Sequence, residues 1–305
     1  MDKQDELRKK ARGLLESKKV EQIIGYAKGS NSTRTTPKFV SDKNKTEELV
    51  WNSFCTNNLT SYLKGIKNKT AIVVKGCDSR ALVEMLKAKQ VERENLCIIG
   101  VCCDGIVDSG KLFQKIKFDP NRDEVKEDIE NLFIHKNKIS KKDVLLDKCL
   151  FCEYKIPVIF DTLIGKETKE RIKDEFLDVK EIEKMSAEGK KKFWKGQFEK
   201  CIGCFACRNV CPICYCEKCV LESRDPELVS SDENDRWLFH LVRAYHTTGR
   251  CVDCGECERV CPVRIPLRKL YRKLQKDVKE VFGYSAGVDP EEKNVLMDFK
   301  IDEEP

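Results

Sequence analysis

The sequence of 305 residues contains no apolar run long enough to cross a bilayer, so we expect no membrane span. Its charged N-terminus is not followed by the apolar stretch of a secretory signal, so we expect a cytoplasmic protein. Histidine is scarce, and His135, His240 and His246 are not spaced as ligands of one metal ion. For His240, which falls in a predicted helix, we expect a position at the surface or beside metal ligands.

A large excess of one charge is also missing. Lys and Arg number 58 against 52 Asp and Glu, and the net charge of +6 is spread along the whole length. This fits a solvated surface, with a basic face for an acidic partner as the alternative. No basic stripe is interleaved with aromatic residues, which argues against a nucleic-acid-binding protein with purely structural metal clusters.

Cysteine, in contrast, is abundant. A chain with 18 cysteines and no export signal indicates metal ligation in a reducing compartment, not disulfides. Eight of these cysteines form two runs of identical spacing, here named the first and the second ladder. They are Cys201-x2-Cys204-x2-Cys207-x3-Cys211-Pro212 and Cys251-x2-Cys254-x2-Cys257-x3-Cys261-Pro262.

The ladder spacing is that of bacterial two-cluster ferredoxins, in which three thiolates of a run hold one 4Fe–4S cluster and the fourth binds the other cluster. One such run would also suit zinc, but two identical runs, each with its proline, predict two 4Fe–4S clusters. The predicted ligand sets are therefore crossed. They are Cys201, Cys204 and Cys207 with Cys261, and Cys251, Cys254 and Cys257 with Cys211.

The N-terminal half has the pattern of an α/β fold. Ala71–Val74 and Leu96–Val101 are short apolar runs, and Ser79–Lys89 between them has apolar residues at helical spacing. Strand, helix and strand over about thirty residues predict a βαβ unit with two parallel strands. We also predict a strand at Pro157–Phe160.

The C-terminal half is predicted to be helical. The spacer between the ladders contains a helix with Trp237, Leu238, Leu241, Val242 and Tyr245 on one face. A further helix follows Pro266 and ends at Gly283. We therefore predict four parts, which are an α/β domain with a short parallel sheet (1–165), a helical connector (166–200), an α-helical ferredoxin-like domain of the bacterial 2x(4Fe–4S) type with an inserted helix (201–285), and a tail (286–305).

Three cysteines lie just after the two predicted parallel strands. Cys77 follows the first strand, and Cys102 and Cys103 follow the second. Because ligands of open α/β sheets bind at the carboxyl ends of the strands, we expect these thiols at one crevice. Cys97, inside an apolar strand, fits a small buried side chain.

Two further groups of closely spaced cysteines indicate a third metal centre, because such spacing converges thiolates on one point. They are Cys149-x2-Cys152 and Cys214-x-Cys216-x2-Cys219. The first pair either completes a four-thiolate site with Cys77 and Cys103 or joins two cysteines of the second group. Four thiolates suit iron–sulfur and zinc alike.

A cofactor phosphate is a further prediction for the crevice. The segment from Gly76 to Arg80 opens a helix after a strand, so its amides are suited to an anion, although a plain strand-to-helix turn has the same appearance. If FAD binds, its predicted contacts are Gly76, Asp78, Ser79, Gly100 and Gly105.

Several motifs match known families. In the N-terminal half they are Asn52-x-Phe54-Cys55-x2-Asn58-Leu59-x2-Tyr62-Leu63, the segment from Lys75 to Leu82, and Ile98-Ile99-Gly100-Val101-x-Cys103-x-Gly105. These resemble the beta-subunit family of deazaflavin-reducing hydrogenases and formate dehydrogenases. The second ladder with its flanks, Gly249-Arg250 and Ile265-Pro266, is similar to ferredoxin modules of heterodisulfide-reductase-type complexes.

The resemblance implies an iron–sulfur subunit of an anaerobic multi-subunit oxidoreductase. Such a subunit relays single electrons between a catalytic partner and a carrier such as ferredoxin, deazaflavin or nicotinamide, and it is not a stand-alone enzyme with catalytic residues of its own. Many family members also hold FAD, so a flavin-containing subunit that itself reduces deazaflavin or nicotinamide is the alternative. Lys200 and Arg250 place positive charge beside the ladders, which favours the reduced, more negatively charged clusters.

Overall fold

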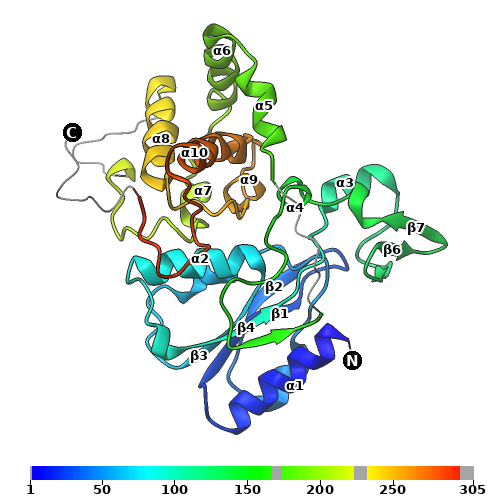
Figure 1. Cartoon of the computed structure of the whole chain (residues 1–305). Coiled ribbons are helices and arrows are strands. Elements are labelled where there is room, and N and C mark those ends of the chain that lie inside the picture. The colour runs from blue at the N-terminus through cyan, green and yellow to red at the C-terminus, as the bar shows by residue number, and fades with distance from the viewer. Residues whose placement is uncertain (1, 167–173, 223–231, 296–305) are drawn as a thin grey trace. The chain divides into compact units, whose positions relative to one another are not determined.

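The computed structural model describes residues 2–166, 174–222 and 232–295 and divides into two compact units (Figure 1). Unit 1 comprises residues 1–82 and 91–173, and unit 2 comprises residues 83–90 and 174–305. The predicted fold class, an α/β part with parallel strands and a helical part that carries the ladders, is confirmed. In the described segments, no helix is long and apolar enough to cross a membrane.

Unit 1 is built on a five-stranded mixed sheet with the order β2-β1-β3-β4-β8. The strands are β1 (Gln22–Lys28), β2 (Thr35–Val40), β3 (Thr70–Val74), β4 (Leu96–Val101) and β8 (Thr162–Ile164). β2 is antiparallel to β1, whereas β1, β3, β4 and β8 run parallel to one another. All residues of β3 are buried, as expected for a parallel strand that is covered on both faces.

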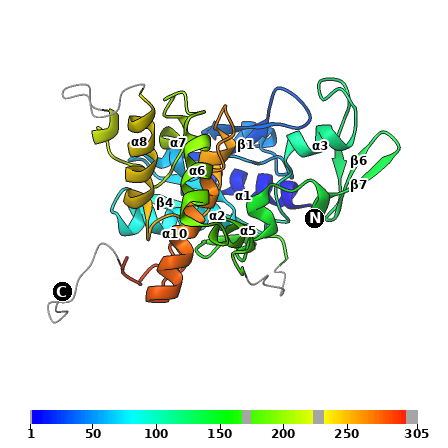
Figure 2. The ribbon, with the colours of Figure 1, turned by 90° about the horizontal axis from the view of Figure 1, so that it is seen from above.

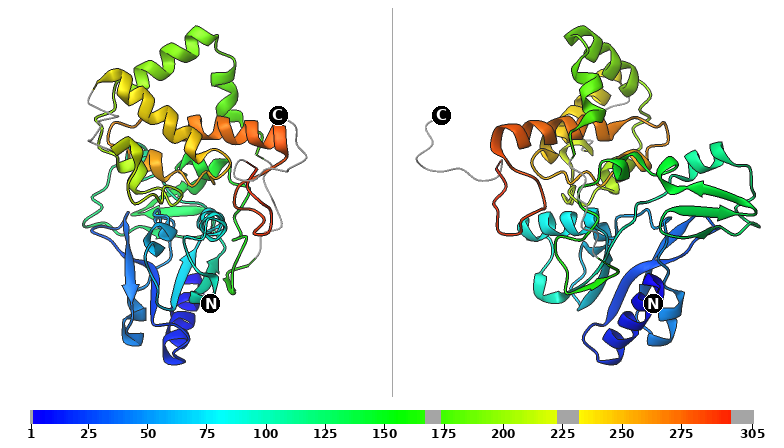
Figure 3. Two further views of the ribbon diagram at one scale, coloured as in Figure 1. Left: turned by 90° about the vertical axis from the view of Figure 1, so that its left-hand side faces the viewer. Right: turned by 45° about the vertical axis from the view of Figure 1, so that its right-hand side comes forward.

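Helices cover this sheet on both sides. The helix α2 (Gly76–Lys87) connects β3 to β4, so the predicted βαβ unit is confirmed. Figures 1 and 3 show α1 (Lys3–Glu16) on the opposite side of the sheet from α2. α1 buries Leu7, Ala11 and Leu14, which form one apolar stripe at helical spacing.

Two features of unit 1 differ from the sequence expectation. The predicted strand Pro157–Phe160 is wrong, because this segment is irregular and the strand β8 begins at Thr162. A small antiparallel sheet was not predicted, and Figure 3 shows it to one side of the large sheet. Its strands are β5 (Lys126–Glu127), β6 (Asn131–Ile134) and β7 (Asn137–Ser140), and they lie between the helices α3 (Ser109–Lys115) and α4 (Asp147–Leu150) along the chain. Strands this short carry almost no alternation of apolar and polar residues.

Unit 2 contains helices and irregular segments, and its described residues form no strand (Figure 2). The helices are α5 (Leu177–Glu183), α6 (Ala187–Phe198), α7 (Ala206–Asn209), α8 (Glu233–Thr247), α9 (Glu256–Arg259) and α10 (Leu267–Phe282). The two predicted long helices are confirmed as α8 and α10. α10 ends at Gly283, whose positive φ of 68° is the left-handed conformation that terminates helices. The predicted tail extends into residues 296–305, which lie outside the described residues.

α8 turns a different face to the core than its apolar residues suggest. Leu238 and Tyr245 are 45% and 70% exposed, whereas His240 and Arg243 are buried. The core of unit 2 is aromatic, and the His240 ring stacks on Phe198 with ring centroids 4.5 Å apart. The expected surface position of His240 is therefore wrong. Burial lowers its pKa to about 4, with a further contribution from the Arg243 charge, so the ring is neutral at pH 7.

Candidate iron–sulfur site

The two ladders form loops of the same geometry. The third and fifth residues of each loop have positive φ, at 65° and 53° in the first ladder and at 56° and 70° in the second. These residues are Gly203 and Phe205, and Asp253 and Gly255. A helix of four residues follows at the same position in each ladder, α7 in the first and α9 in the second. Such tight turns let three cysteines of one run face a common point, as a cluster requires.

In the first ladder, Cys207 shows which thiols lie together. Burial raises the pKa of Cys207 to about 11, and repulsion from neighbouring thiolates adds to this rise. The thiolates that act on it are Cys201, Cys204 and Cys261. Cys261 belongs to the second ladder, and its Sγ accepts a hydrogen bond from the Ile265 amide at 3.3 Å. Amide hydrogen bonds to sulfur are one of the means by which proteins tune a cluster.

The second ladder surrounds a small cavity that is partly open to solvent. Its lining includes Cys211, Cys251, Cys254 and Cys257. Burial raises the pKa of Cys251 to about 12 and that of Cys257 well above the ordinary value, and Cys211 raises both further. In each ladder, therefore, the fourth cysteine lies with the first three of the other ladder. This is the crossed grouping that the ferredoxin spacing predicts.

Charged side chains around the second ladder are paired. Asp253, inside the loop, accepts hydrogen bonds from Arg268 at 2.7 Å and from Arg272 at 3.1 Å. Glu256 pairs with Arg259 at 2.7 Å. The two arginines of α10 also bind Asp178 at the start of α5, so this ionic network fixes α5, α10 and the loop to one another.

The remaining cysteines of unit 2 have separate positions. Cys214 lies against Cys211, and its hydrogen bond lowers the pKa of the Cys211 thiol. Cys216 is exposed, and Cys219 packs against the aromatic core.

In unit 1, four cysteines come together at the carboxyl ends of β3 and β4. Burial raises the pKa of Cys77 and Cys152 to about 12 and that of Cys103 to about 11, and it also raises the pKa of Cys149. Cys152 is repelled by all three of the others. The structure thus brings Cys149 and Cys152 together with Cys77 and Cys103. This is one of the two four-thiolate groupings that the sequence allows for a third metal centre. Cys102 and Cys97 are buried as well.

All three groups fit a metal cluster by their chemistry, since each presents four thiols, although Cys204 of the first ladder is exposed. In the described segments, no three His, Cys, Asp or Glu side chains are placed to hold a single metal ion. A 4Fe–4S cluster makes a different demand on its site, because each of the four thiolates binds a different iron.

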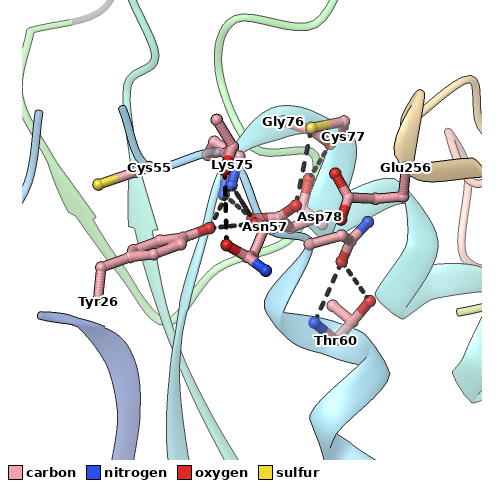
Figure 4. Close-up of polar contacts among 12 residues, drawn as sticks. Tyr26, Cys55, Asn57, Thr60, Lys75, Gly76, Cys77, Asp78 and Glu256 are labelled. Carbon is pink, nitrogen blue, oxygen red and sulfur yellow. Dashed lines mark hydrogen bonds and ion pairs between the residues drawn. The ribbon is translucent and has the colours of Figure 1, made fainter. Parts of the chain in front are cut away.

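A buried lysine lies next to the thiols of unit 1 (Figure 4). Lys75 is 1% exposed, and its ammonium group donates hydrogen bonds to the Asn57 carbonyl at 2.8 Å and to the Tyr26 hydroxyl. It pairs with Asp78 at 2.9 Å. Burial alone would lower the pKa of Lys75, but the attraction of Asp78 and Cys77 outweighs it and raises the pKa. Lys75 is therefore a permanent positive charge beside this group.

Two of the residues predicted to bind a cofactor make internal contacts. Asp78 is fully buried and, besides pairing with Lys75, accepts a hydrogen bond from the Lys75 amide. The Ser79 hydroxyl donates to the Gly76 carbonyl at 2.8 Å and accepts from the Val158 amide at 2.9 Å. The bond from Val158 holds the segment after Cys152 against the start of α2.

The predicted glycines lie close to other parts of the chain. A Cβ at Gly76 would stand 1.6 Å from the Tyr154 carbonyl oxygen, and one at Gly100 would stand 2.9 Å from the Phe160 side chain. Gly105 has a positive φ of 106°. The protein's own segment 154–160 thus accounts for the glycines at 76 and 100, and FAD at this crevice remains a prediction.

We expect Gly76→Ala to destabilise unit 1 by about 3 kcal/mol, because the added methyl group meets a backbone carbonyl that cannot rotate away. Gly13→Ala in α1, where nothing lies within 4 Å, is the matched control and should stabilise by about 0.5–1 kcal/mol. Urea unfolding of both variants measures the difference. Equal stability of the two variants would contradict the close packing at Gly76.

Sequence reasoning missed the buried cations Lys75, Lys148 and Arg243. Lys148 is buried next to Cys149, and its charge lowers the pKa of Cys77 and Cys149. For Lys75 a signal existed, because a lysine directly after a wholly apolar strand is unusual. For Arg243 no sign of burial was visible in the sequence, because the most apolar face of α8 is a different one.

The repeated loops and the crossed grouping of their thiols define an iron–sulfur electron-transfer protein of the two-cluster ferredoxin class. In agreement, the family described as 4Fe-4S dicluster domain matches residues 197–265.

Over most of its length, the chain is similar to beta subunits of formate dehydrogenases. It is 26% identical to the F420-dependent formate dehydrogenase subunit beta of Methanocaldococcus jannaschii. The alignment, 341 residues long with its gaps, covers 90% of this chain and 89% of the relative. The F420-dependent formate dehydrogenase 1 subunit beta of Methanococcus maripaludis is 28% identical over 348 residues, which covers 91% and 89%. A solved chain of the F420-reducing [NiFe] hydrogenase complex from Methanosarcina barkeri aligns with a TM-score of 0.38 and 13% identity, over 49% of this chain and 62% of that chain.

The predicted resemblance to beta subunits of formate dehydrogenases is confirmed by the two relatives. The predicted function is confirmed at the level of an iron–sulfur electron-transfer subunit of an oxidoreductase complex.

Proposed function

We propose that the chain relays electrons through three 4Fe–4S clusters between a catalytic partner that oxidises formate and the deazaflavin F420. The observation that carries this proposal is the crossed grouping of the ladder cysteines in unit 2, with four of them around one cavity. The formate and F420 assignments are supported by the printed names of the two relatives.

The two ladder sets are the proposed ligands of two clusters. Cys201, Cys204, Cys207 and Cys261 would hold the first, and Cys211, Cys251, Cys254 and Cys257 the second. Because each set takes one ligand from the other run, the two clusters are held close together in one folded unit. Short separation is what an electron relay needs.

The third proposed cluster is held in unit 1 by Cys77, Cys103, Cys149 and Cys152. Its support is the mutual repulsion of these thiols and their burial at the edge of the sheet where α/β proteins bind ligands. Lys75 and Lys148 supply positive charge there, which offsets the negative charge that four thiolates bring.

When bound, a 4Fe–4S cluster accepts and releases one electron at a time. The chain's own residues bury it, donate amide hydrogen bonds to its cysteines and set the local charge. Ile265 and Ile106 make such amide bonds, to Cys261 at 3.3 Å and to Cys149 at 3.4 Å. The two electrons from a substrate such as formate would therefore pass through this chain singly.

Metal analysis of the anaerobically purified chain tests this proposal. Three clusters require about 12 iron and about 12 sulfide per polypeptide, with a visible absorption that dithionite bleaches. Cys103→Ala should lose about four iron and keep the ladder signals in the EPR spectrum, because it removes one ligand of the unit 1 cluster only. Cys97→Ala, which removes a buried thiol outside the three sets, should keep all the iron.

Other results of the same analysis would change the assignment. One zinc per chain that disappears in Cys103→Ala would make the unit 1 site a zinc site. Stoichiometric FAD would favour the flavin-containing alternative. A colourless chain without iron would overturn the proposal.

A further inference from the structure

Arg243 lies deep inside unit 2, on the face of α8 that packs against the core. It is 3% exposed. One end of its guanidinium group donates a hydrogen bond to the Cys207 carbonyl at 2.8 Å, and the other end donates to the Tyr271 hydroxyl. The guanidinium carbon also stands 5.0 Å from the centre of the Tyr271 ring. The position of this side chain is thus fixed by both the first ladder and α10.

Unlike the other buried arginines of unit 2, Arg243 pairs with no carboxylate among the described residues. Arg268 and Arg272 are buried on α10 and share Asp178 and Asp253. Arg243 instead has two neutral acceptors, a carbonyl and a phenol whose pKa is raised by burial. A buried charge without a counter-charge is strongly unfavourable, so a partner of opposite sign is expected at this place.

The groups that face Arg243 are cysteines of both crossed sets. It lines the cavity of the second ladder together with Cys211, Cys251 and Cys257, and it binds the backbone of Cys207 from the first set. The two acidic side chains that line the same cavity, Asp253 and Glu256, are already paired with other arginines.

We propose that Arg243 is the counter-charge of both ladder clusters and sets their reduction potentials. A 4Fe–4S cluster with four thiolates is an anion, and reduction adds one further negative charge. A fixed guanidinium between the two sets stabilises the reduced state of each, and thereby raises both potentials. This inference rests on the proposed clusters. It assigns a role to the helix that is inserted between the ladders, since α8 brings Arg243 to this position.

Reduction potentials of the full-length holoprotein test the proposal. We would replace Arg243 by Met, which removes the charge at similar length, by Gln, which is neutral but keeps N–H donors, and by Lys, which keeps the charge. An anaerobic redox titration followed by EPR gives the potential of each ladder cluster. Iron content before each titration establishes that both clusters are present.

Arg243→Met and Arg243→Gln should lower both potentials by at least about 59 mV, a tenfold change in the equilibrium constant of a one-electron couple. Arg243→Lys should lower the two potentials much less, because it keeps the positive charge. Arg250→Gln is the matched control, because Arg250 lies next to Cys251 but is only half-buried and binds the Tyr215 hydroxyl. Its shift should be smaller, since water screens the charge.

Unchanged potentials in a neutral variant that retains its iron would overturn the proposal, and so would equal shifts in the Lys and Gln variants. If Arg243→Met fails to fold, the reduction potentials of the Gln and Lys variants test the proposal in the same way. A wild-type chain without ladder clusters would instead refute the proposed function, so the two failures are distinguishable.

Discussion

Removing Cys204 and Cys261 together is expected to cost no more iron than removing either one alone. Each single alanine variant should lose one cluster, about four iron, because both cysteines belong to the first crossed set. The double variant Cys204→Ala/Cys261→Ala should therefore keep about eight of the proposed 12 iron. The double variant Cys204→Ala/Cys211→Ala removes one ligand from each set and should keep only about four.

If the ladders are not crossed, the double variant that keeps more iron is Cys204→Ala/Cys211→Ala. In that case Cys204 and Cys211 would serve one cluster, and removing both would cost a single cluster. Iron and sulfide analysis with EPR of the reduced protein is sufficient to tell the patterns apart. Circular dichroism provides the folding control, since unit 1 has its own core and should keep its sheet in all four variants.

Replacing Lys75 by methionine is expected to destabilise unit 1 by about 3–5 kcal/mol, because Asp78 is then left as a buried charge without its partner. The substitution also leaves the Asn57 carbonyl and the Tyr26 hydroxyl without their donor. Asp78→Asn combined with Lys75→Met should recover a large part of the loss, since no charge then remains unpaired.

Urea unfolding measures this effect, followed by tryptophan fluorescence in a background in which Trp194 and Trp237 of unit 2 are replaced by phenylalanine. Trp51 lies in unit 1, with its ring centroid 6.1 Å from that of Tyr26. Lys9→Met, at an exposed position of α1, is the matched control and should change stability by less than about 0.5 kcal/mol. If Lys75→Met is as stable as this control, or if the double variant recovers nothing, the buried pair does not have the assigned role.

The βαβ unit and the long helices were predictable because each depends on a local pattern. β3 and β4 are continuous apolar runs, and α10 ends at a glycine in the conformation that glycine favours. β8 was misplaced because Pro157–Phe160 is as apolar as a strand, although these residues pack over Gly100 instead. Hydrophobicity alone does not separate the two cases.

The site was predictable to the extent that spacing determines it. Both ladders are sets of cysteines close together in the sequence, so their chemistry follows from their spacing. The four thiols of unit 1 come from distant segments, and two alternatives remained open until the fold brought Cys77 and Cys103 to Cys149 and Cys152. Arg243 was missed because the burial of α8 depends on its partners, which include the Phe198 and Tyr271 rings.

The high pKa of the buried thiols in unit 1 bears on how the chain matures. Iron binds the deprotonated thiolate, so each of these cysteines must release a proton in surroundings that oppose the charge. We therefore expect iron to enter, and the thiol protons to leave as it binds, before the segment that follows Cys152 settles over α2. On this account the unloaded chain stays open at one edge, and delivery of the metal completes its folding.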